Sequence, residues 1–233
     1  MFFDPMFFLF VGPAMLVGLW AQWRTKSQYA KASKQPASLS GAAAARHMLD
    51  SAGLQSVGIE PIPGELTDHY DPRAKVLRLS QGVYGPRTMA AVGIAAHEAG
   101  HALQDAKGYA PLVIRNLAVP AAGFGSGAGV WMIIGGAMLS GSMPEFGDTL
   151  IWAGIIAFSA VVFFQLVNLP VEFDASNRAK KQLVSYGIVP ESEMGAVNGV
   201  LNAAAWTYVA ATLTAIATLA YYLWRFAGAS SND

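Results

Sequence analysis

Long apolar runs alternate with polar segments along this chain of 233 residues. Four runs hold about 20 mostly apolar residues each, the length that a helix needs to cross the hydrocarbon core of a bilayer. Most of the tryptophans fall near the ends of these runs, as interfacial aromatic side chains tend to do. The pattern predicts a mainly α-helical, multi-pass membrane protein whose spans are residues 5–23, 117–139, 149–169 and 203–226.

The first run has the length of a secretory signal peptide. It lacks a basic segment before it, because Asp4 is the only charged residue there, and no A-x-A-like cleavage site precedes the polar stretch. We therefore expect residues 1–23 to be a retained N-terminal membrane anchor.

The polar segments predict two regions outside the bilayer, 24–116 and 170–202, and a short tail, 227–233. In the larger region we expect a helix over about 41–52, with Ser40 as its N-cap and Gly53 as its stop. The stretch "GIEPIPGELTDHYDPRAKVLRLSQGVYG" predicts turns, apart from a strand at "AKVLRLS". A helix over about 86–106 follows.

The distribution of basic residues predicts the topology. Eleven Lys and Arg lie between Arg24 and Arg115, three lie between Arg178 and Lys181, and the link "SGSMPEFGD" has none. The positive-inside rule then puts both polar regions in the cytoplasm and both chain ends outside. Residues 117–169 would form a transmembrane hairpin, and 203–226 a C-terminal span.

Composition narrows the chemistry. Hydrophobic residues make up 54% of the chain and charged residues only 13%, as expected for a membrane protein whose partner is the lipid bilayer. A formal net charge of zero, without a basic patch among aromatic residues, argues against nucleic-acid binding. Because the chain has no cysteine, a metal must be held by His, Asp or Glu.

The stretch "AAHEAGHALQD", residues 95–105, carries the candidate chemistry. On a helix His97 and His101 lie on the same face, one turn apart, so both can bind one zinc ion. Glu98 projects beside them and can take a proton from water that zinc activates. The motif predicts hydrolysis of peptide bonds.

A third ligand must come from elsewhere, because position 107 is Lys and not the histidine of the extended motif. A carboxylate on a second helix fits best, and "NLPVEFDASNRA" offers Glu172, with Asp174 as the alternative. Pro170 is suitably placed to start that helix. His47 is expected to be a surface or core polar residue.

Four ordered motifs, "MFFDP", "LTDHYDPR", "AAHEAGHALQDAKGYAPLVIRN" and "LPVEFDASNRA", resemble those of the YugP-like family of membrane-bound neutral zinc metallopeptidases. The resemblance covers nearly the whole chain. It implies a small α+β, zincin-like cytoplasmic domain and a single Zn²⁺ ion. The chain is also distantly similar to gluzincins of the HtpX and Ste24 type, whose third ligand is the Glu of E-x-x-x-D. That Glu aligns with Glu172, but Ser176 stands in place of the Asp, so Asp174 becomes the candidate for orienting a histidine.

Three further residues are candidates for contact with substrate. His69 can line the cleft or stabilise an oxyanion, or can be a local cap between Asp68 and Asp71. Tyr84 and Arg178 can donate to a tetrahedral intermediate or be structural. The strand "AKVLRLS" can be an edge that pairs with an extended substrate, or an ordinary strand that shields the helix.

Two other interpretations remain open. A site-2-type intramembrane protease also uses H-E-x-x-H, but here the apolar part of the helix around His97 is shorter than a span. A non-catalytic scaffold or chaperone with a structural metal would not need Glu98. We therefore expect a zinc metalloendopeptidase of the bacterial plasma membrane, with its active site facing the cytoplasm and membrane-associated proteins as substrates.

Overall fold

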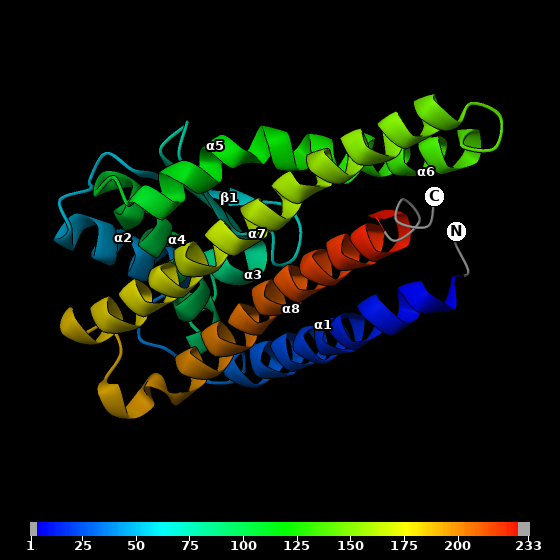
Figure 1. Ribbon diagram of the computed structural model, residues 1–233. Helices are drawn as coiled ribbons and strands as arrows, with labels where there is room; N and C mark the ends of the chain where they lie inside the picture. The colour runs from blue at the N-terminus through cyan, green and yellow to red at the C-terminus, as the bar shows by residue number, and fades with distance from the viewer. Residues whose placement is uncertain (1–3, 228–233) are drawn as a thin grey trace. The chain divides into compact units, whose positions relative to one another are not determined.

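The computed structural model describes residues 4–227, which are mainly helical (Figure 1). A small sheet and short helices interrupt the long helices. In chain order the elements are α1 (Pro5–Ala32), α2 (Gly41–Ser51), β1 (Gly58–Ile62), β2 (His69–Asp71), β3 (Val76–Ser80), α3 (Gln81–Tyr84), α4 (Met89–Ala106), α5 (Ala110–Phe124), the π-helical η1 (Gly125–Gly129), α6 (Val130–Leu139), α7 (Pro144–Ser185), the 3-10 helix η2 (Glu191–Glu193) and α8 (Met194–Ala227).

Four helical stretches of the described chain are long and apolar enough to cross a membrane, as the sequence predicted. They extend beyond the predicted spans: Pro5–Ala32, Ala110–Leu139, Pro144–Ser185 and Glu191–Ala227. The helix with the H-E-x-x-H motif, α4, is not one of the four. The predicted tail, 227–233, lies almost entirely outside the described residues.

The third stretch corrects one prediction. Pro170 was expected to start a new helix, but it lies inside the continuous helix α7. A proline inside a helix costs about 3 kcal/mol because it removes one backbone hydrogen bond. Packing of the flanking turns must offset that cost. The apolar stretch that could cross a membrane and the turn with Glu172 belong to one helix.

The chain divides into two compact units. Unit 1 comprises the described parts of Met1–Trp20, Ile114–Leu169 and Tyr208–Asp233. Unit 2 comprises Ala21–Val113 and Pro170–Thr207. Both units therefore receive residues from α1, α5, α7 and α8.

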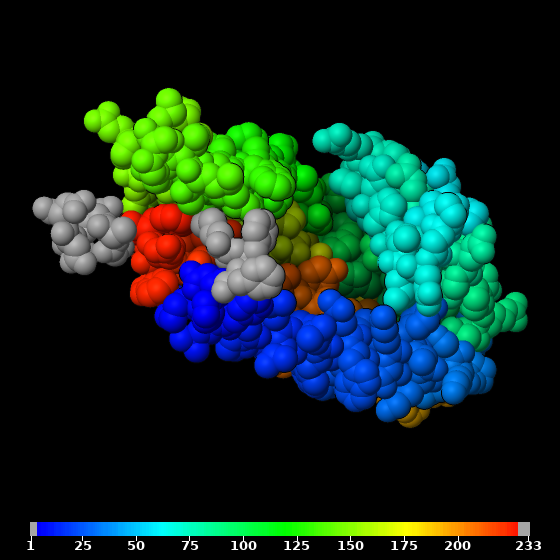
Figure 2. Space-filling view, turned by 90° about the vertical axis from the view of Figure 1, so that its right-hand side faces the viewer, coloured from blue at the N-terminus to red at the C-terminus, as the bar shows by residue number. Residues whose placement is uncertain are grey.

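Within unit 1, glycines let α7 pack closely against η1 and α6. A Cβ on Gly125 would lie 2.1 Å from the carbonyl oxygen of Ala157, so no larger residue fits there. The first turns of α1 pack beside the last turns of α8, where the Phe7 and Tyr221 rings meet edge to face at 5.2 Å (Figures 1 and 2). The Tyr221 hydroxyl also donates to Asp4 at 2.8 Å.

Within unit 2, the sheet has the order β1-β3-β2, with β1 parallel and β2 antiparallel to β3. The strand predicted at "AKVLRLS" is β3, and it is central. Both of its edges are paired, so the suggestion that it receives a substrate strand is wrong. Strands β1 and β2 lie in the stretch predicted as turns, because each is too short to show a clear alternation.

The core of unit 2 encloses α4. Ser40 caps α2 and accepts a hydrogen bond from the backbone of Ala43, as predicted. Helix α4 begins at Met89 because Thr88 caps it, accepting from Ala91 at 3.2 Å. Apolar side chains of α2, β3, α4, α7 and α8 share one buried cluster around this helix.

Candidate metal centre

Helix α4 presents its two histidines on one face. Their rings lie 4.8 Å apart, nearly perpendicular to each other. The residues between and behind them are small and buried, including Ala96, Ala99 and Ala102. Neighbouring helices can therefore approach this part of α4 closely, and His101 is itself almost fully buried.

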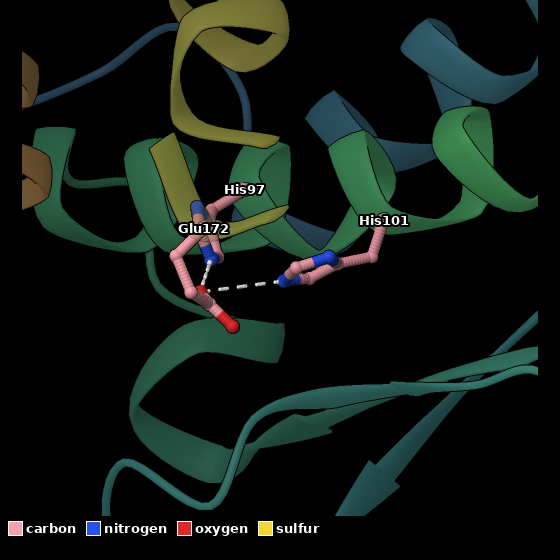
Figure 3. Close-up of side chains that lie close together, drawn as sticks. All are labelled: His97, His101 and Glu172. Atoms are coloured by element: carbon pink, nitrogen blue, oxygen red, sulfur yellow. Dashed lines mark hydrogen bonds and ion pairs between the residues drawn. The ribbon is translucent and has the colours of Figure 1, made fainter. Parts of the chain in front are cut away.

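Helix α7 brings a carboxylate to the histidines. A Cβ on Gly100 would lie 2.6 Å from the carbonyl oxygen of Ala175, so glycine at this position permits the helix contact. One turn earlier, Glu172 Oε2 lies 3.2 Å from His97 Nε2 and 3.6 Å from His101 Nε2 (Figure 3). The sequence separation between His97 and Glu172 is 75 residues.

This donor set fits zinc. The three side chains can each offer one ligand atom, and those atoms all lie within 4.8 Å of one another. Zn–N and Zn–O bonds of about 2.0–2.1 Å in a tetrahedral arrangement separate neighbouring ligand atoms by about 3.3 Å. The two measured separations from Glu172 Oε2 lie on either side of that value. Two imidazoles and one carboxylate leave a fourth position open, as in catalytic zinc sites.

Polar partners hold the far side of each imidazole. Ser176 Oγ lies 3.1 Å from His97 Nδ1, and Gln104 Oε1 lies 2.9 Å from His101 Nδ1. Both rings therefore turn Nε2 toward Glu172. Asp174, the alternative third ligand, instead accepts from Gln104 at 2.8 Å and from Arg178 at 2.5 Å.

The carboxylates raise the proton affinity of His101. Burial alone would lower the pKa of its imidazole, but the hydrogen bond with Glu172 and the nearby charges of Glu98 and Glu172 outweigh burial, so the pKa is raised. The His101 ring therefore keeps its proton more readily than a free imidazole does. Metal binding at this cluster is expected to release a proton.

A backbone group of β2 holds Glu98. The Tyr70 N–H donates to Glu98 Oε2 at 3.1 Å, while the Tyr70 hydroxyl donates to Asp105 at 2.7 Å. Lys75 also donates to Asp105, at 2.5 Å. Burial and the bond to Asp105 raise the pKa of Tyr70 above its usual range. Strand β2 therefore contacts the stretch 95–105 at Glu98 and at Asp105, and the bond from the Tyr70 N–H uses one of the two Glu98 oxygens.

The remaining predicted residues have local partners. His69 is exposed at the start of β2, where its Nδ1 lies 2.9 Å from the Thr67 carbonyl oxygen, which favours the local role. Tyr84 packs against the apolar core of unit 2. Arg178 pairs with Asp174 and stacks over the ring of Tyr109 at 5.6 Å.

Gln104 and the backbone of Tyr70 were not predicted from sequence. Gln104 follows His101 by three residues on a helix, so it lies on the same face, and this spacing was an available signal. The contact of Tyr70 with Glu98 spans 28 residues and depends on how β2 packs, which no local pattern reveals.

Comparison with known proteins agrees with this geometry. Residues 7–227 match a family described as "Putative neutral zinc metallopeptidase". The chain is also 47% identical over 224 residues to a Bacillus subtilis (strain 168) protein named "Putative membrane protease YugP", covering 95% of this chain and 97% of that protein. No solved structure matches it significantly.

Proposed function

The chain belongs to the family described as "Putative neutral zinc metallopeptidase", and from this premise we propose that it is a membrane-embedded zinc metalloendopeptidase. The observation that carries the proposal is that His97, His101 and Glu172 lie together as possible metal ligands. The Glu98 carboxylate is close enough to help raise the pKa of His101, and it accepts a hydrogen bond from the Tyr70 N–H through Oε2. A purely structural metal site would not need that carboxylate.

Each residue has a distinct role in this proposal. His97, His101 and Glu172 hold one zinc ion, which supplies the Lewis acidity that activates water and polarises the carbonyl of a peptide bond. Glu98 accepts the proton of the attacking water and returns it to the leaving amine. The hydrogen bond from the Tyr70 N–H limits rotation of Glu98, so that its free oxygen stays beside the histidines.

We also propose that the active site faces the cytoplasm and cleaves membrane-associated proteins. Two features support this proposal. The lysines and arginines are concentrated in 24–116 and 170–202. Helix α4, which carries the motif, is not among the helices that can span a membrane, which favours a site at the membrane surface over a site-2-type intramembrane site.

The first test is cleavage by a Glu98→Gln variant. The full chain in detergent, loaded with zinc, is incubated with fluorescently labelled casein as an unfolded probe. Glu98→Gln should retain zinc and lose about 100-fold or more of the cleavage rate, because a positioned general base contributes about 10²–10⁴-fold. Glu193→Gln, at an exposed carboxylate, serves as the matched control.

Unchanged cleavage in Glu98→Gln would remove Glu98 from its role.

If Glu98→Gln is inactive, natural substrates can be identified by comparing the membrane proteome of cells that carry the wild-type protein with that of cells that carry Glu98→Gln. Membrane proteins that accumulate only with the variant are the expected substrates. Accumulation of soluble proteins alone would contradict the proposed substrate class.

A further inference from the structure

We propose that Gln104 is a positioning residue, which determines that His101 offers Nε2 rather than Nδ1 to the metal. The inference rests on the metal site of the proposed function, but it concerns a residue outside the ligand set. Each neighbour of the Gln104 amide either can donate a hydrogen bond or can only accept one, and this property fixes the orientation of the amide.

The surroundings of Gln104 leave its amide only one orientation. The side chain is fully buried. One end of the amide lies 2.8 Å from the carbonyl oxygen of Val171 and 2.8 Å from Asp174 Oδ2. A carbonyl and a carboxylate can only accept, so the NH₂ group of Gln104 must face them. A flipped amide would place its oxygen against two acceptors.

The orientation of the amide determines which ring nitrogen of His101 carries the proton. Because the NH₂ group faces α7, Oε1 faces His101 Nδ1 at 2.9 Å and can only accept. His101 must then carry a proton on Nδ1. The lone pair of a neutral imidazole is consequently on Nε2, the atom that lies 3.6 Å from Glu172 Oε2.

The same turn of α7 carries Glu172, the proposed third ligand, and the groups that orient the amide of Gln104. Val171 and Asp174 flank Glu172 in sequence, so the groups that orient Gln104 move together with the third ligand. Arg178 donates to Asp174 at 2.5 Å and balances its charge. The hydrogen-bond chain therefore runs from Arg178 through Asp174 and Gln104 to His101.

His97 has a less selective partner. Ser176 Oγ lies 3.1 Å from His97 Nδ1, but a hydroxyl can either donate or accept. Ser176 can therefore support both neutral forms of the ring, whereas Gln104 in this setting supports one. This difference singles out Gln104 and not Ser176 as the residue that selects a tautomer.

The test measures the zinc dissociation constant of the full chain in detergent, by competition with a chelator. Gln104→Met keeps the length of the side chain but removes the acceptor. It should weaken zinc binding about 10- to 100-fold, the usual effect of removing a partner of a ligating histidine. Gln182→Met, at a half-buried glutamine on α7 outside the network, should bind zinc like the wild type. Wild-type affinity in Gln104→Met would overturn the proposal.

A swapped pair separates positioning from packing. In Gln104→Glu combined with Asp174→Asn, one carboxylate oxygen again accepts from His101 Nδ1 and the other accepts from the new amide. The bond to the Val171 carbonyl is lost in this double variant, as it is in Gln104→Met, so the two differ in the acceptor for His101. This double variant should bind zinc more tightly than Gln104→Met. If it binds no better, the defect of Gln104→Met is a packing defect and the proposal fails.

The wild-type protein gives a readout that does not depend on a variant folding. Long-range proton–nitrogen correlation NMR on the zinc-loaded chain resolves its four histidines. His101 should carry its proton on Nδ1 and bind zinc through Nε2, and zinc on Nδ1 would overturn the proposal. Absence of bound zinc in the wild type would instead contradict the proposed function, so the two failures are distinguishable.

Discussion

The two histidines of the candidate metal centre differ in how tightly their rings are held. His101 is almost fully buried, and its partner Gln104 has two further polar contacts, with the Val171 carbonyl and with Asp174. His97 depends on one hydroxyl, that of Ser176. Both nevertheless direct Nε2 at the same carboxylate oxygen, so at the scale of residues the cluster is prepared for a cation before one binds.

Removal of either histidine should abolish the metal site. We expect the purified wild-type chain to contain about one zinc ion per molecule, as a catalytic site with three protein ligands implies. His97→Ala and His101→Ala should each lose it, measured by elemental analysis. His47→Ala changes an exposed histidine on α2 and is the matched control. Zinc retained at the wild-type level in both variants would contradict the metal site.

Glu172 and Asp174 should respond differently to substitution. Glu172→Ala removes the oxygen nearest both histidines and should abolish zinc binding. Asp174→Ala removes one of two acceptors of Gln104, so it should retain one zinc ion with weaker affinity. Zinc content after dialysis at a fixed free zinc concentration separates the two. The opposite result would make Asp174 the third ligand.

At the scale of elements, the close contact of α4 and α7 in unit 2 assembles the centre. Val171, Ala175, Ala179 and Leu183 recur every fourth residue on α7, and all are fully buried. Glu172 directly follows Val171, the first residue of this buried face. Packing of this face therefore determines how far the carboxylate stands from the histidines.

Gly100→Ala should damage the site through this contact. The added Cβ would lie 2.6 Å from the backbone of Ala175, and overpacking of this kind costs about 1–3 kcal/mol. We expect a lower Tm and weaker zinc binding, measured by thermal unfolding with and without zinc. Gly195→Ala, on α8 with open space at its Cβ, should leave both unchanged. Equal behaviour of the two variants would show that the helix contact does not control the site.

At the scale of the whole molecule, long helices contribute residues to both units. Helix α7 gives Pro144–Leu169 to unit 1 and Pro170–Ser185 to unit 2. Because no break occurs at Pro170, the apolar part of α7 and the turn with Glu172 belong to one continuous helix. Insertion of this helix into the bilayer and delivery of the third ligand are therefore expected to be coupled.

The proposed topology can be tested because the chain has no cysteine of its own. Ser142→Cys, in the link between α6 and α7, should react with a membrane-impermeant maleimide in intact spheroplasts. Lys107→Cys, at the end of α4, should react only after the membrane is permeabilised. Both positions are exposed on the protein, so a difference in labelling between them reports the side of the membrane and not burial within the protein. The reverse pattern would put the active site on the outer face.

The sequence by itself determined the features that arise from local periodicity. Runs of apolar residues predicted four membrane-length helices, and the i, i+4 spacing of His97 and His101 predicted a shared ligand face. The caps at Ser40 and Thr88 are also local, although only Ser40 was predicted. These features need no distant partner, because a helix relates each residue only to those within about one turn.

Only the tertiary structure decided what depends on packing between distant segments. The strands β1 and β2, the continuity of α7 through Pro170 and the hydrogen bond from Tyr70 to Glu98 all required neighbours far away in the chain. The polar partners of the histidines also depend on distant segments. Asp174 of α7 is connected to His101 of α4 through hydrogen bonds with Gln104. A carboxylate near the motif was foreseeable from zinc chemistry, but its distance from the histidines depends on the contact between Gly100 and Ala175.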